Sequence, residues 1–165
     1  MKRLIFSLIV LALYTGTLRG QSQASANFTA SVTIIEPIGI TTTANMNFAR
    51  IDARSGGIVT LTPENTRVST GGVQLEGGGM VSAATFKITG QKGYAYAVSL
   101  PQEAYTLSSG ENEIIIENFQ SNLSSGTLKE EPQIIRVGAS LRINPNQTPG
   151  FYTSRQSFQV TVNYN

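Results

Sequence analysis

The chain has 165 residues, with 12 Lys plus Arg against 10 Asp plus Glu, and it contains no His, Cys or Trp. The lack of Cys and His excludes disulfides, thiol nucleophiles and thiolate or imidazole metal ligands. It also removes the side chain whose ordinary pKa lies near neutrality, which excludes most common hydrolase and transferase mechanisms. The length fits one domain with a substantial core.

The amino terminus has the layout of a secretory signal peptide. Lys2 and Arg3 precede an apolar run over residues 4–14, which is too short to span a bilayer comfortably and is followed by small and polar residues. We expect residues 1–20 to be the signal, with a cut as late as residue 26 as an alternative. An uncleaved membrane anchor is the other alternative, but we expect no transmembrane helix in the mature form.

Removal of the signal changes the net charge of the chain. Lys2, Arg3 and Arg19 leave with it, so nine cationic residues face ten anionic ones and the net charge falls from +2 to −1. The remaining cations are scattered singly. Because nucleic acid binding depends on neutralising phosphates, nucleic acid is not an expected partner.

Residues 27–165 are expected to form a single all-β domain. Apolar and polar residues alternate with a period of two, and Gly-, Asn- and Pro-containing turns interrupt them every 8 to 12 positions. Half-buried strands with polar outer faces predict two packed antiparallel sheets, an Ig-like antiparallel β-sandwich. The expected strands cover residues 27–35, 45–51, 58–62, 73–75, 86–88, 94–100, 112–119, 135–143 and 152–165.

The sequence offers little for catalysis. Glu111, Glu113 and Glu117 are able to share one strand face, but a solvated surface explains them better. The chain has a single Asp and no calcium-loop motif, and no Gly-rich stretch carries a phosphate-binding ending. We therefore predict no catalytic, metal or cofactor-binding residues and no enzymatic role. An enzyme with a glutamate pair at hydrolase spacing is the third alternative.

Both ends of the mature chain carry an alternating apolar face. Near the amino end the face consists of Phe28, Ala30, Val32 and Ile34, and Pro37 interrupts the pattern. Near the carboxyl end the face consists of Phe158, Val160, Val162 and Tyr164. A terminal strand of this kind is able to pair within its own sheet or to complete the sheet of a neighbour. The residues alone leave both arrangements open.

Several short segments, in their order along the chain, resemble the DUF4402 domain of secreted bacterial proteins. That domain in turn looks like the spore coat U and chaperone–usher fimbrial subunit group. The resemblance covers nearly all of residues 26–165. Its carriers are residues 31–38, 46–48, 82–86, 137–141, 149–152 and 160–165.

The resemblance implies a pilin-like, incomplete Ig-like sandwich whose groove is filled by the amino-terminal extension of another subunit. By this resemblance, Phe28, Val32 and Ile34 are the inserted side chains, Tyr164 is the penultimate tyrosine, and the carboxy-terminal strand frames the groove. The expected function is a structural or adhesive subunit that assembles by β-strand complementation. The expected location is the periplasm or cell surface of a bacterium. Expected partners are copies of itself or related subunits, and a periplasmic chaperone.

The alternative function is a monomeric extracellular β-sandwich that binds a carbohydrate or cell-wall polymer. Tyr94, Tyr105 and Tyr152 are its candidate stacking platforms.

Overall fold

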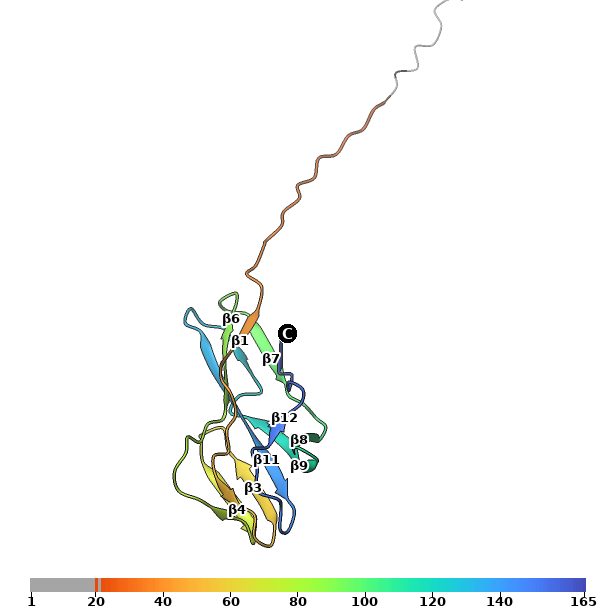
Figure 1. Ribbon diagram of the computed structural model, residues 1–165. Coiled ribbons are helices and arrows are strands. Elements are labelled where there is room, and N and C mark those ends of the chain that lie inside the picture. The colour runs from red at the N-terminus through yellow and green to blue at the C-terminus, as the bar shows by residue number, and fades with distance from the viewer. Residues whose placement is uncertain (1–19, 21) are drawn as a thin grey trace, which may run out of the picture. The chain divides into compact units, whose positions relative to one another are not determined.

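The computed structural model describes residue 20 and residues 22–165, so the rest of the predicted signal peptide lies outside the described residues. Residues Ile35–Asn165 form one compact unit, and the described residues contain antiparallel strands and no helix (Figure 1). The strands are β1 (Gly39–Ala44), β2 (Ile51–Asp52), β3 (Gly57–Leu61), β4 (Arg67–Gly71), β5 (Gln74–Leu75), β6 (Ala84–Thr89), β7 (Ala95–Ser99), β8 (Tyr105–Ser109), β9 (Asn112–Ser121), β10 (Ser125–Thr127), β11 (Gln133–Ile143), β12 (Thr153–Ser154) and β13 (Thr161–Tyr164).

Strand β11 is the centre of the larger sheet. It pairs along one edge with β6 through residues 133–137 and with β3 through residues 139–143, and its other edge pairs with β9. A period-two pattern places alternate residues on one face, so the odd-numbered residues 135–143 are all buried. The strand predicted over 135–143 is confirmed.

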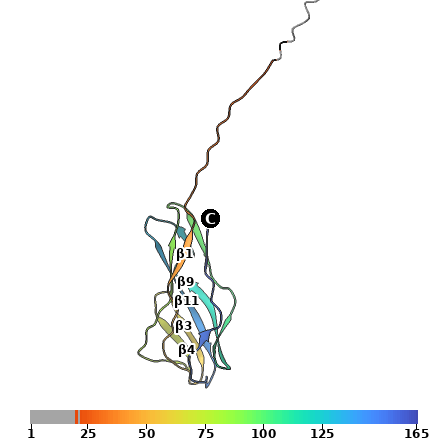
Figure 2. The ribbon, with the colours of Figure 1, turned by 45° about the horizontal axis from the view of Figure 1, so that its top comes forward.

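Two smaller sheets cover the larger one. The strand order of the larger sheet is β1-β6-β11-β9-β8-β12, and β3 also pairs with β11 and with β4. The sheet β10-β7-β13 packs on one half, where Tyr96 and Val162 meet Ile88. The pair β2-β5 packs on the other half, where Ile51 and Leu75 contact a second cluster. Figure 2 shows β1 toward the same end as the carboxyl terminus, with β3 and β4 toward the opposite end. The predicted all-β sandwich is confirmed.

The strand expected over residues 45–51 is mostly absent. Only Ile51 belongs to a strand, and Asn47 forms an isolated bridge with Ser82. Ala49 adopts a φ of 55°, which lies outside the extended region that a strand requires. Strands β1, β4, β8 and β10 have no predicted counterpart, because they are rich in Thr, Ser and Gly and carry a weak apolar alternation.

The two terminal segments also differ from the predicted strands. Residues 27–35 contain no strand and join no sheet in the part of the chain that the structure describes. The segment 152–165 holds two short strands, because β12 pairs with β8 in the larger sheet and β13 pairs with β7 in the three-stranded sheet. Phe158 and Val160 therefore lie in the crossing between the sheets and not in a strand.

Candidate functional site

An open groove of about 880 Å³ lies between two parts of the domain that are distant in sequence. One wall is formed by residues 45–54, which follow β1 and include β2, and the other by residues 146–154, which include β12. Among the described strands, β2 pairs only with β5 and β12 only with β8. Each wall therefore contains a strand edge without a strand partner, and such edges accept an added strand through main-chain hydrogen bonds.

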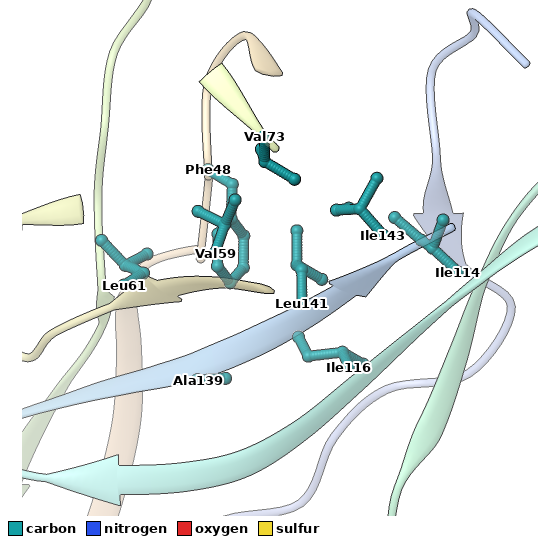
Figure 3. Close-up of a cluster of buried hydrophobic side chains, with 9 residues drawn as sticks. All are labelled: Phe48, Val59, Leu61, Val73, Ile114, Ile116, Ala139, Leu141 and Ile143. Atoms are coloured by element: carbon teal, nitrogen blue, oxygen red, sulfur yellow. The ribbon is translucent and has the colours of Figure 1, made fainter. Parts of the chain in front are cut away.

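Core side chains line the floor of this groove. They are Ile114 and Ile116 on β9 and Leu141 and Ile143 on β11 (Figure 3). The walls shield them in the empty groove, since their exposed fractions are only 2–7%. The groove thus has an apolar floor between walls that also carry polar side chains, among them Asn47, Asp52 and Gln147.

The turn before β12 forms one rim of the groove. Phe151 lines it and is 85% exposed, which is unusual for a large aromatic side chain. Gly150 packs closely on β8, because a Cβ there would lie 2.4 Å from Ser109 Oγ. The rim therefore holds Phe151 at the mouth of the groove, where it is available to cover an occupant.

One wall residue has an unsatisfied acceptor. Gln147 Nε2 donates to the Tyr152 hydroxyl at 2.9 Å, and that hydroxyl donates to the Thr148 carbonyl at 2.7 Å. Gln147 Oε1 is the only buried side-chain oxygen or nitrogen without a partner in the described part of the chain. An unpaired buried acceptor costs about 1–3 kcal/mol. A hydrogen-bond donor from an occupant of the groove would remove this cost.

The candidate donor segment presents its apolar side chains to solvent. Phe28, Val32 and Ile34 are 92%, 85% and 90% exposed, and Ala30 on the same face is also exposed. Exposed apolar side chains at alternate positions are costly unless a partner covers them. The structure thus contains a groove with an apolar floor and an uncovered segment with an alternating apolar face.

The chain is anchored where this segment joins the domain. Glu36 N–H donates to Gln91 Oε1 at 3.1 Å, and the Glu36 carbonyl accepts from the Tyr164 hydroxyl at 2.7 Å. The same hydroxyl accepts from Gln91 N–H at 2.7 Å, and the Tyr164 ring packs against Tyr94 at 5.5 Å between ring centroids. Gly90 leaves the room for this contact, because its Cβ would lie 2.5 Å from the hydroxyl. We call Glu36, Gln91 and Tyr164 the Glu36 anchor.

Replacing Tyr164 with phenylalanine is expected to loosen the Glu36 anchor. The substitution leaves the Glu36 carbonyl and the Gln91 amide without this partner, at a cost of about 1–2 kcal/mol in unfolding free energy. Hydrogen exchange at the Gln91 amide should accelerate accordingly. Tyr94→Phe is the control, because the Tyr94 hydroxyl makes no hydrogen bond among the described residues. Equal protection of Gln91 in both variants would contradict this role of Tyr164.

The structure separates the four predicted residues of the carboxy-terminal face. Phe158 lines the groove and packs against Tyr105 and Phe119, with centroid distances of 5.2 and 5.3 Å. Val162 lies on β13 and is buried in the cluster that contains Ile88 and Tyr96, and Val160 packs against this cluster. Tyr164 belongs to the Glu36 anchor. The segment 45–54, which supplies the opposite wall, was not identified as a site in the sequence, because its pattern indicates an ordinary strand.

Each of the three candidate sugar platforms has partners within the domain. Tyr94 packs on Tyr164, Tyr105 packs on Phe119 and Phe158, and the Tyr152 hydroxyl is bonded to Thr148. No observation therefore assembles them into a single stacking site.

Some ionisable side chains of the described residues pair within the domain. Glu117 pairs with Arg142 across β9 and β11 at 2.5 Å, while Glu113 is exposed. No group of three or more metal-ligating side chains occurs in the described residues, and no helix there is long and apolar enough to cross a membrane. Burial raises the pKa of Tyr96, whose neutral hydroxyl donates to Gln133 Oε1 at 2.5 Å. This hydroxyl thus serves the packing of the core.

Fold and groove together define the class of protein: an antiparallel β-sandwich with an open groove, apolar at its floor, between two strand edges without a strand partner among the described strands. Residues 38–164 match the family described as "Domain of unknown function (DUF4402)", and the chain belongs to this family. No curated protein and no solved structure matches the chain. The matched region begins after Ile34, so the family assignment covers the groove and not the candidate donor segment.

Proposed function

We propose that this protein is a secreted structural or adhesive subunit of the bacterial cell surface, fimbria-like in its assembly, which associates by β-strand complementation. The observation that carries the proposal is the coexistence of the groove with the exposed face of Phe28, Ala30, Val32 and Ile34. Strand addition uses main-chain hydrogen bonds for affinity and alternate side chains for specificity. The strand edges of the groove supply main-chain groups for the hydrogen bonds. The apolar floor supplies the surface that alternate side chains would contact.

The resemblance of the sequence to spore coat U and fimbrial subunits, described above, supports the same proposal. The predicted signal peptide directs the chain to the periplasm and the cell surface, where a chaperone would hold the groove before assembly. The partners are copies of this chain or related subunits. The role is not catalytic, in keeping with the lack of His and Cys in the sequence.

A deletion tests the donor and the groove together. Removing residues 27–35 from the chain expressed without its predicted signal should leave the domain folded, because this segment contributes to no sheet. The deleted protein should lose self-association in size-exclusion chromatography and electron microscopy. It should also bind a synthetic peptide of residues 26–36, detected by fluorescence anisotropy.

The matched control is the same peptide carrying Val32→Asp, which keeps the length and backbone but places a charge on the apolar face. Binding of both peptides with equal affinity, or of neither, would overturn strand complementation as the mode of association. Unchanged self-association of the deleted protein would overturn residues 28–34 as the donor.

A further inference from the structure

A second, shallow cleft of about 450 Å³ lies where β10 faces the first residues of β11. We call it the β10 cleft, and its lining includes Leu123, Ser125, Thr127, Lys129, Gln133 and Ile134. Gln133 spans the cleft, because its Nε2 donates to the Thr127 carbonyl and its Oε1 accepts from the Tyr96 hydroxyl, each at 2.5 Å. The cleft shares no lining residue with the groove described above, so the two are separate features.

The outer edge of β10 presents main-chain groups to this cleft. The Ser124 carbonyl accepts from the Val98 N–H at 2.8 Å, so it points toward β7. Successive residues of a strand direct their main-chain groups to opposite edges, so Ser125 and Thr127 direct theirs away from β7. Gln133 occupies the Thr127 carbonyl. The Ser125 N–H and carbonyl and the Thr127 N–H have no hydrogen-bond partner among the described residues.

The facing edge of β11 also has free main-chain groups. The Arg136 N–H donates to Asn122 Oδ1 at 2.7 Å, and the Arg136 carbonyl accepts from the Asn122 N–H at 3.1 Å. These groups therefore point away from β6, and those of Ile134, two residues earlier in the strand, have the same orientation. Pairing of β9 with β11 starts only at Val137, and no other described residue bonds to the main chain of Ile134 on this edge.

Three cationic side chains without a partner surround the β10 cleft. Lys129 lines it. Lys87 on β6 is the register partner of Ile134, and Arg136 lies two residues further along the same face of β11. Of the nine cations that follow the predicted signal, the four with side-chain partners among the described residues are Arg54, Arg67, Lys92 and Arg142. Cations that are scattered in the sequence are thus gathered here by the pairing of β6 with β11.

The surroundings of the cleft favour an anionic partner with an apolar side chain. The turn before β11 carries Glu130, which pairs with Lys92, and Glu131, which makes no ion pair among the described residues. Three unpaired cations therefore face one unpaired carboxylate, and this excess of positive charge attracts anions. Leu123 and Ile134 are 38% and 40% exposed, so a partner also has apolar surface to cover.

We propose that the β10 cleft binds an extended acidic peptide of a partner protein, which adds to the free edge of β10 as a further strand. The main chain of the peptide pairs with the free groups of Ser125 and Thr127, and its carboxylates face the three cations. An apolar side chain covers Leu123 and Ile134. Strand addition of this kind takes its affinity from main-chain hydrogen bonds and its specificity from side chains. Because the cleft is separate from the groove, this binding does not depend on strand complementation there.

A pair of synthetic peptides tests the charge of the partner. The probe is a capped, fluorescein-labelled peptide of alternating glutamate and valine, and its control carries lysine in place of every glutamate. The chain expressed without its predicted signal should bind the glutamate peptide at least about tenfold more tightly in fluorescence anisotropy, and added salt should weaken this binding. Equal binding of the two peptides, or no binding of the glutamate peptide, would overturn the proposal. Binding of dextran sulfate without binding of the glutamate peptide would assign the cations to an anionic polysaccharide instead.

Substitutions locate the binding on β10. Thr127→Pro removes a free N–H and should weaken peptide binding at least about tenfold, whereas Thr127→Val keeps this N–H and should stay within about threefold. Lys129→Glu should weaken binding about tenfold, and its control is Arg155→Glu, which makes the same charge change after β12, outside the lining of the cleft. Equal losses in the two glutamate variants would mean that net charge alone governs binding, and would overturn the site.

Hydrogen exchange at the Ser125 amide reports strand addition without a proline. This amide has no partner in the described chain and should become protected when the glutamate peptide binds. Peptide binding that leaves the Ser125 amide unprotected, or that survives in a folded Thr127→Pro protein, would show attraction of charge without an added strand. Either result would overturn the proposal.

Discussion

Replacing Val32 with aspartate is expected to weaken self-association about 100-fold or more. In the groove, the carboxylate would be desolvated among isoleucine and leucine side chains, at a cost of several kcal/mol, and about 3 kcal/mol corresponds to a 100-fold loss of affinity. Val32 is 85% exposed and belongs to no sheet, so the unfolding free energy of the domain should change by less than about 0.5 kcal/mol. Light scattering over a concentration series and chemical denaturation measure the two quantities.

Thr33→Asp is the matched control for Val32→Asp. It adds the same charge one residue away, and alternate residues of an extended segment point to opposite faces. The Thr33 side chain would face away from the groove floor, so this variant should associate within about threefold of the unmodified protein, the scale of a surface charge effect. Equal losses from the two substitutions would mean that net charge, and not insertion of an apolar face, governs association.

The largest expected effect on stability is at Gly138, where β11 changes its partner from β6 to β3. A Cβ at this position would lie 2.0 Å from the Leu61 carbonyl oxygen and 2.9 Å from two carbonyl carbons. All three are backbone atoms, so relief requires β3 to move away from β11 and to disturb the core around Leu61. Gly138→Ala should therefore lower the unfolding free energy by about 3 kcal/mol, at the upper end of overpacking effects.

Gly77→Ala controls for the loss of a glycine. No atom lies within 4 Å of a Cβ at Gly77, and its φ is not positive, so the substitution should be neutral or slightly stabilising. Urea denaturation of both variants provides the comparison. A Gly138→Ala protein as stable as Gly77→Ala would show that β3 is able to shift away from β11 at little cost.

In the proposed assembly, the two ends of the domain have different roles. Tyr164, in the strand expected to frame the acceptor groove, donates its hydroxyl hydrogen bond to the Glu36 carbonyl at the base of the proposed donor segment. Phe158 is the member of the predicted carboxy-terminal face that lines the groove. The proposed acceptor groove is thus lined mainly by residues 45–54 and 146–154, around a floor formed by β9 and β11.

The amino-acid sequence by itself determined the all-β class, the long strands and the family. Long strands such as β11 were predictable because a period-two apolar pattern identifies a buried face without knowledge of its partner. The same pattern occurs at Phe28, Val32 and Ile34, but there the structure shows exposed side chains and no strand. The short strands β4 and β10 were not predictable. Their Thr, Ser and Gly residues carry little apolar alternation, and these segments become strands by pairing with β3 and β7.

Only the tertiary structure decided where the groove lies. The groove depends on two strand edges from distant parts of the chain that stay unpaired, and pairing is a property of neighbours that no single segment encodes. The register of β11 likewise decides which strand pairs with each half of it, β6 along residues 133–137 and β3 along residues 139–143. Local periodicity therefore defines which face of a strand is apolar, and sheet register defines which neighbour that face is able to meet.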